Sequence, residues 1–234
     1  MVSIDTVYQR VLALANKEQR GYIPPVKFNL YANQAQMDIF EQYFYDRTQF
    51  GRRNGNQTMY ADPIDILEEK IEIFHRSETL TNTVDPLNIF NLENLTDQYY
   101  RLAQVTTLAE NGVGSIVEKL IHSKFQLVAK SPLTKPSLSR PVYYLEETSL
   151  ILNPETISSI NINFIKKPSV VVWNGTSIGD TLVYSSGKDF DLHISEETKL
   201  VMKILQLAAI EMKDAQLYQV SSSEDIKNIQ QEKQ

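Results

Sequence analysis

The chain of 234 residues contains no cysteine and only three histidines. Without cysteine it forms no disulfide, holds no zinc through thiolates and has no cysteine nucleophile, which suits assembly in a reducing cytoplasm. His75, His122 and His193 stand far apart and show neither HxH nor HxxxH spacing, so no metal centre is indicated. A carboxylate partner for His193 could come from Asp189 or Asp191, but a surface turn ahead of a helix is the favoured interpretation.

Nucleotide-binding and hydrolase motifs are also missing. The sequence contains no GxxxxGK[ST], GxGxxG or GxSxG, and the segment NGVGS at 111–115 lacks the lysine of a phosphate-binding loop. No long uninterrupted apolar run is present, and the start MVSIDTVYQR lacks a basic region followed by an apolar stretch. We therefore expect no catalytic residues, no cofactor, no secretion signal and no membrane association.

Charge is unevenly distributed along this acidic chain, whose formal net charge is −6. Residues 62–100 contain nine Asp and Glu against two Lys and Arg, whereas residues 101–173 contain five against eight. The acidic band is either a solvated surface or one half of a complementary contact between neighbouring copies. The acidic balance argues against a duplex-DNA binder, although it allows a channel through which DNA slides.

Helical patterns dominate the first half of the sequence. Capping residues, prolines and apolar spacing predict a helix from Ser3 or Asp5 to about Glu18, with others at 25–49, 62–76, 97–108 and 113–125. The third of these carries an acidic face. Because acidic residues at four-residue spacing usually form a solvated face, a metal-dependent nuclease or another enzyme built on helix 62–76 is the less favoured alternative.

The second half is predicted to begin with short strands. The segments 142–145, 149–153, 159–166, 170–173 and 181–184 are rich in β-formers and separated by turn signals, and a short hairpin is expected within 78–95. Ser195 is expected to cap a last helix, which is apolar nearly all round between Leu200 and Ile210. Such a helix is buried either within one subunit or against a neighbouring subunit.

These patterns predict an α+β fold with an N-terminal helical bundle, one small antiparallel β-sheet and a long C-terminal helix. The expected segments are a mainly helical part at 1–130, a β part at 131–194, the helix at 195–220 and a polar tail at 221–234. The C-terminal helix is expected to pack on the helical part or on a neighbouring subunit.

Several stretches of the chain resemble virion structural proteins of crAss-like tailed bacteriophages. The stretches are VYQRVLALANKEQRGYIPP with FNLYANQAQMDIFEQYFYD, then SPLTKPSLSRPVYYLEE, NINFIKKPSVVVW and DFDLHISEETKLVMKILQLAAIEMKDAQLYQ, and they span roughly Ser3 to Gln219. The resemblance implies a head–tail connector or tail ring protein in the virion, made in the bacterial host cytoplasm. It also implies a homo-oligomer of about twelve copies around the DNA channel that joins the portal protein to tail components, with genomic DNA as passing cargo. A non-virion assembly factor is the other alternative.

Candidate contact residues follow from this ring hypothesis. The expected subunit-interface residues are Ile204, Leu205, Ala208, Tyr218 and Trp173. Trp173, the only tryptophan, is either an interface anchor or a residue at the rim of the core. Arg52 and Arg53, in a loop rich in Gly and Asn, could contact a partner protein or the DNA channel.

Overall fold

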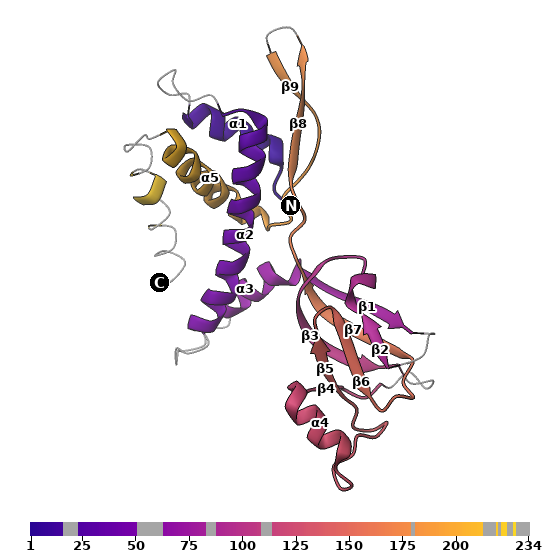
Figure 1. Cartoon of the computed structure of the whole chain (residues 1–234). Helices are drawn as coiled ribbons and strands as arrows, with labels where there is room; N and C mark the ends of the chain where they lie inside the picture. Colours follow the sequence, from indigo (N-terminus) through magenta and orange to yellow (C-terminus); the bar gives the residue numbers. More distant parts are fainter. Residues whose placement is uncertain are drawn as a thin grey trace. The chain divides into compact units, whose positions relative to one another are not determined.

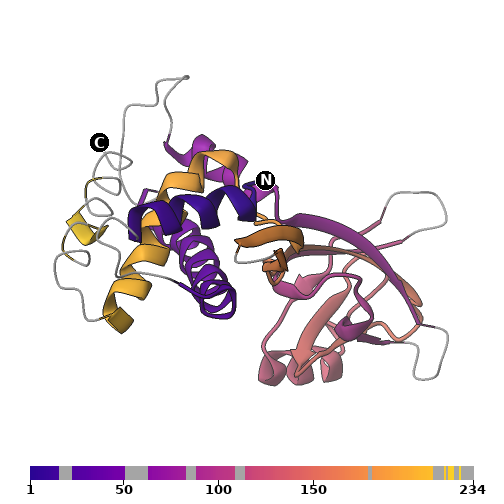
Figure 2. The same ribbon diagram turned by 90° about the horizontal axis from the view of Figure 1, so that it is seen from above.

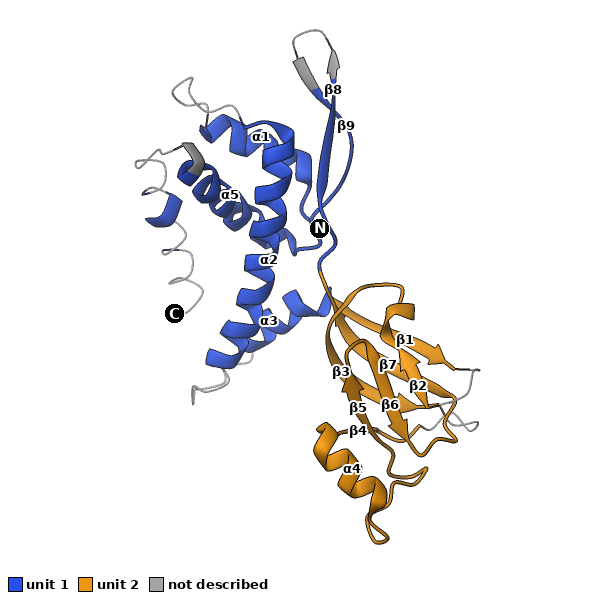
Figure 3. Ribbon diagram, viewed as in Figure 1, with its two compact units in different colours: residues 1–73, 168–234 blue, residues 74–167 orange. Residues whose placement is uncertain are grey.

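A computed structural model describes residues 1–15, 23–50, 63–82, 88–108, 114–178 and 181–212, with 219, 221–223 and 227. The chain divides into two compact units (Figure 3). Unit 1 comprises Met1–Ile73 and Pro168–Gln234, and unit 2 comprises Phe74–Lys167. Unit 2 is therefore an insertion in unit 1. Its boundaries fall inside the predicted segments 1–130 and 131–194, whereas the predicted segment 195–220 lies entirely within unit 1.

Unit 1 combines helices with one β-hairpin (Figures 1 and 2). Helix α5 contacts both α1 and α2, while α3 contacts α2. The hairpin strands β8 and β9 extend away from these helices in Figure 1. The elements of unit 1 are α1 (Ile4–Ala15), α2 (Pro25–Phe50), α3 (Pro63–Glu72), β8 (Val172–Ile178), β9 (Thr181–Lys188), the 3-10 helix η3 (Ile194–Glu196) and α5 (Glu197–Met212).

The starts of the first three helices agree with the sequence patterns. The Ser3 hydroxyl lies 3.5 Å from the Thr6 amide, so Ser3 caps α1. Helices α2 and α3 begin at Pro25 and Pro63, where the missing N–H of proline costs no intrahelical hydrogen bond. Proline and capping residues act locally, which is why the sequence alone located these starts.

Unit 2 is built mainly of β-strands. One sheet has the strand order β1-β7-β3 and is antiparallel, and the other has the order β2-β6-β5-β4, in which only β4 and β5 are parallel. Its elements are β1 (His75–Thr81), β2 (Ile89–Asn91), the 3-10 helix η2 (Leu92–Asn94), β3 (Tyr99–Thr107), β4 (Glu118–Lys119), α4 (His122–Lys130), β5 (Val142–Glu146), β6 (Ser149–Asn153) and β7 (Ser159–Lys166).

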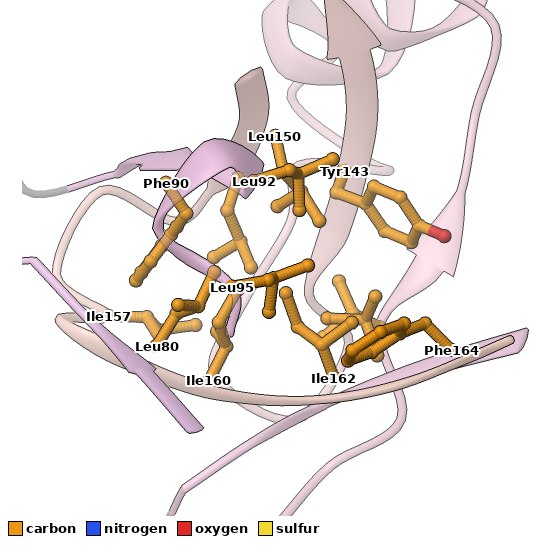
Figure 4. Packing of buried hydrophobic residues seen from close by; sticks show 13 residues of the cluster. Leu80, Phe90, Leu92, Leu95, Tyr143, Leu150, Ile157, Ile160, Ile162 and Phe164 are labelled. Carbon is orange, nitrogen blue, oxygen red and sulfur yellow. The ribbon is translucent and has the colours of Figure 1, made fainter. Parts of the chain in front are cut away.

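The two sheets of unit 2 share one apolar core (Figure 4). Ile160, Ile162 and Phe164 alternate along β7 and are fully buried, while Leu150 and Leu152 do the same along β6. This period of two puts one face of each strand into the core. The predicted strands 142–145, 149–153 and 159–166 are therefore confirmed.

The predicted fold class is wrong in its arrangement. The structure mixes helices with three sheets instead of one small sheet, and no N-terminal bundle of all predicted helices forms among the described residues. The expected helix 97–108 is strand β3, and much of 113–125 is occupied by strand β4 and the start of α4. The expected hairpin within 78–95 is also wrong, because β1 and β2 belong to different sheets. Residues 99–107 have apolar spacing that suits a helix, but their pairing with the distant strand β7 favours the extended conformation.

The C-terminal helix begins later than predicted. Ser195 is not its cap, because His193 caps η3 by accepting a hydrogen bond from the Ser195 amide at its ring nitrogen Nδ1. Helix α5 follows at Glu197 and is described as far as Met212. Strands β8 and β9 likewise extend past the predicted ranges 170–173 and 181–184 and form a separate sheet.

We predict that Ile162→Ala lowers the free energy of unfolding by about 2–5 kcal/mol, because it leaves a cavity in the core of unit 2. Urea unfolding followed by far-UV circular dichroism measures the change. Ile121→Ala is the matched control, since its side chain is 70% exposed and its removal leaves no cavity. Equal losses in the two variants would contradict the shared core.

Candidate functional site

Three amide side chains on one face of α2 bind an extended backbone segment of the same unit. Asn29 Oδ1 accepts from the Trp173 amide at 2.8 Å, and Asn29 Nδ2 donates to the Trp173 carbonyl at 3.1 Å. Asn33 makes the same pair of bonds with Val171, both at 2.9 Å. Gln36 Nε2 donates to the Ser169 carbonyl at 2.8 Å. We call these three amides and segment 169–173 the amide ladder.

The spacing of the ladder follows from the geometry of its two elements. Positions 29, 33 and 36 fall on one helix face at successive turns, whereas Ser169, Val171 and Trp173 are alternate residues of an extended chain. One helical turn rises about 5.4 Å and two extended residues about 6.6 Å, so the two spacings are close enough for the register to hold over the two steps between the three amides. The side chains of α2 therefore pair with this segment as a neighbouring strand would.

A buried carboxylate extends the ladder toward α5. Asp191 is 4% exposed, and its Oδ2 accepts from the Ser169 amide at 3.0 Å and from the Ser169 hydroxyl at 2.7 Å. The Asp191 amide donates to Gln36 Oε1 at 3.0 Å, so both ends of Gln36 are used. The chain on both sides of the hairpin is thus fixed to α2.

The base of the hairpin is closed by Trp173, which is 1% exposed. Its indole N–H donates to Asp5 Oδ1 at 2.9 Å, and its ring lies 4.5 Å from Tyr8 and 5.9 Å from Tyr184. Gly187 pairs with Trp173, and a Cβ there would lie 2.4 Å from the Val172 carbonyl oxygen. Only glycine fits this close approach, so the β8–β9 hairpin leaves the helices from a tightly packed base.

Most described residues of the hairpin are exposed. From Val183 to Lys188 every residue of β9 is exposed, and so are Asn174 and Thr176 of β8. Within the part of the chain that the structure describes, β8 and β9 pair only with each other. An isolated two-stranded ribbon is at best marginally stable in water, so the anchored base stabilises this one.

The predicted interface residues of α5 lie inside unit 1. Ile204 is fully buried, Leu205 is 2% exposed and Ala208 is 1% exposed. Trp173 is buried in the same unit. The structure therefore favours the alternative that the sequence left open, burial within one subunit. Tyr218, Arg52 and Arg53 lie outside the described residues.

An ion cluster links three elements of unit 1. Lys70 Nζ of α3 lies 2.6 Å from Glu196 Oε1, and Lys199 Nζ of α5 lies 4.0 Å from Glu196 Oε2. Glu196 is 1% exposed and Lys199 is 5% exposed. Removing one partner of such a cluster would leave buried charge uncompensated, so the cluster fixes how η3 and α3 meet.

The acidic face of α3 is solvated. Asp65, Glu68, Glu69 and Glu72 are all exposed, and Glu68 pairs with Arg47 of α2 at 2.8 Å.

The three histidines do not come together. His75 is in β1, His122 contacts the Tyr144 ring, and His193 caps η3. Asp189 and Asp191, which the sequence suggested as partners of His193, bind the Ile4 amide and Ser169 instead.

Sequence reasoning missed the amide ladder. A signal was present, because Asn29, Asn33 and Gln36 interrupt the apolar helix face that also carries Phe28 and Ile39. Amides on the buried face of a helix need hydrogen-bond partners. What the sequence did not contain is the identity of those partners, which come from residues more than 130 positions away.

We predict that Asn33→Ala lowers the free energy of unfolding by about 1–3 kcal/mol, because the amide and carbonyl of Val171 lose their partner. Urea unfolding can be followed by the fluorescence of Trp173, the only tryptophan, at the hairpin base. Gln34→Ala is the control, since Gln34 is the exposed neighbour on the same helix. Indistinguishable midpoints for these two variants would show that the ladder does not stabilise unit 1.

We predict that Ile204→Asp prevents folding of unit 1, because burying an unpaired carboxylate costs several kcal/mol. Circular dichroism and light scattering of the purified variant measure the loss. Ile210→Asp on the same helix is the matched control and should leave the fold intact, since Ile210 is 62% exposed. If the Ile204→Asp protein folds and only fails to associate, Ile204 belongs to a subunit interface, as the sequence analysis predicted.

The part of the chain that the structure describes contains neither a metal-ligand cluster nor a membrane-spanning helix. Among these residues, no group of three or more His, Cys, Asp or Glu side chains could hold a metal ion. No helix in the described ranges is long and apolar enough to cross a membrane. A scan against protein-family models finds no match to this chain, and a comparison with curated proteins finds none either.

Proposed function

We propose that this chain is a non-enzymatic structural component of a phage virion. In this proposal, copies of the chain form an oligomeric ring in the head–tail connector or tail, around the DNA channel. The ring joins the portal protein to tail components, and genomic DNA passes through it as cargo. The resemblance to virion proteins of crAss-like phages supports this role and suggests about twelve copies.

The observation that carries the proposal is the anchored β8–β9 hairpin. Its base is fixed by the amide ladder and by Trp173, on which the Tyr184 ring packs, while described residues farther along the hairpin, such as Val183 (43% exposed), are exposed. A two-stranded ribbon presents backbone donors and acceptors along both edges, which can pair with another chain. A rigidly held ribbon of this kind suits a protein whose role is to contact neighbours.

The division into two units supports the same role. Unit 1 and unit 2 each have their own buried residues, and the chain passes between them at 73/74 and at 167/168. A ring subunit presents two different faces to its neighbours, because cyclic contacts are head-to-tail. Two separately folded units supply two different surfaces for such contacts.

We expect the purified protein, alone or with the portal protein, to form a closed oligomer of about twelve times the chain mass of 26.8 kDa. Native mass spectrometry measures the oligomer, and mass spectrometry of purified virions tests whether the chain is part of the particle. A stable monomer under both conditions, together with absence from purified virions, would contradict the proposal and favour a non-virion assembly factor.

A further inference from the structure

Unit 2 carries an exposed surface that combines apolar and basic side chains. Ile121 is 70% exposed, Leu127 of α4 is 73% exposed, and Leu133 in the following loop is 94% exposed. Lys124 and Lys130, on either side of Leu127, and Lys135 are exposed as well. We call these six residues the α4 patch. Exposed apolar side chains gathered in one short segment commonly mark a contact site.

Helix α4 is weakly attached to its own unit. Phe125 is its only buried residue, and its ring lies 4.5 Å from that of Tyr144, within a small cluster that includes Val142. A helix of nine residues is marginal in water without tertiary packing. The exposed side of α4 therefore gains stability if a second surface covers it.

The charge of the α4 patch indicates what kind of surface covers it. Residues 114–141 contain five Lys and Arg against one Glu. None of the three patch lysines makes an ion pair within the described part of the chain. The complementary surface is therefore acidic and includes apolar area to cover Leu127 and Leu133.

The same chain contains such a surface on α3 of unit 1. Asp65, Glu69 and Glu72 lie at i, i+4 and i+7, so they form a ridge on one helix face, and all three are exposed. They too make no ion pair among the described residues. Ile66, beside this ridge, is 49% exposed and adds apolar area. We call these four residues the α3 ridge.

We infer that the α4 patch of one copy docks on the α3 ridge of a second copy. The two surfaces belong to different parts of the chain, so the contact is heterologous. Each copy uses its patch with one neighbour and its ridge with the other neighbour. Repetition of a heterologous contact closes a ring when the rotation allows it. This inference rests on the proposed ring and names the residues of its subunit contact.

The absence of cysteine makes a cross-linking test direct. Leu127→Cys and Ile66→Cys are purified separately, with tags of different mass, then mixed and oxidised under the conditions in which the wild-type chain associates. We expect covalent dimers that contain one copy of each variant. Leu127→Cys mixed with Ile210→Cys is the control, because Ile210 is also exposed but belongs to α5 and not to α3. As many mixed dimers in the control as in the test pair would overturn the inference.

Charge reversal tests the same contact without cross-linking. K124E/K130E and E69K/E72K should each lower the oligomeric fraction in native mass spectrometry by about tenfold, because like charges then face each other. The chain that carries all four substitutions should recover the oligomer. All four positions are exposed, and unchanged circular dichroism serves as the folding control.

The outcomes separate this inference from the proposed function. A wild-type chain that stays monomeric with and without the portal protein overturns the ring, and the inference with it. A wild-type ring that persists in both charge-reversed variants overturns the inference alone and leaves the ring standing. Loss in both variants without recovery in the combined one also overturns it, and indicates that another acidic protein covers the patch.

Discussion

Pairing between the side-chain amides of α2 and the backbone of residues 169–173 is the interaction on which unit 1 depends. The chain leaves unit 1 after Ile73 and returns at Pro168, so the first residues after the return need an immediate attachment. Asn29, Asn33 and Gln36 provide it by hydrogen-bonding to backbone groups of this segment. Each bond contributes only about 0.5–1.5 kcal/mol net, but leaving these part-buried groups unpaired would cost more.

The other features of unit 1 follow from this attachment. It positions Trp173 against Tyr8 and Asp5, which sets the base of the β8–β9 hairpin. It also holds Asp191, through Gln36 and Ser169, just before η3 and α5 begin. Phe190 donates its amide to the Val2 carbonyl, so the N-terminal residues are fixed to the same place. Three amides on the buried face of α2 thus connect the start of the chain, the hairpin and the segment that leads to the last helix.

Unit 2 is stabilised differently. Its two sheets enclose an apolar core with alternate residues of β6 and β7, and no comparable set of buried amides is found among its described residues. The two units also differ in the charge of one exposed surface. The acidic α3 ridge belongs to unit 1, whereas the basic α4 patch belongs to unit 2. In the proposed ring, separate surfaces of opposite charge on the two units would give each subunit the directionality that a heterologous contact needs.

The sequence by itself determined the features that act over a few residues. Ser3, Pro25 and Pro63 mark helix starts, and alternation identifies β6 and β7, because capping, proline geometry and side-chain period are local properties. Tertiary structure alone decided that residues 99–107 form a strand, since pairing with β7 outweighs their helical spacing. It also decided that Ile204 and Trp173 are buried within the chain and that Asn29, Asn33 and Gln36 bind residues 169–173. Such contacts join residues far apart in sequence, and the residue pattern of one segment does not identify the distant segment that it contacts.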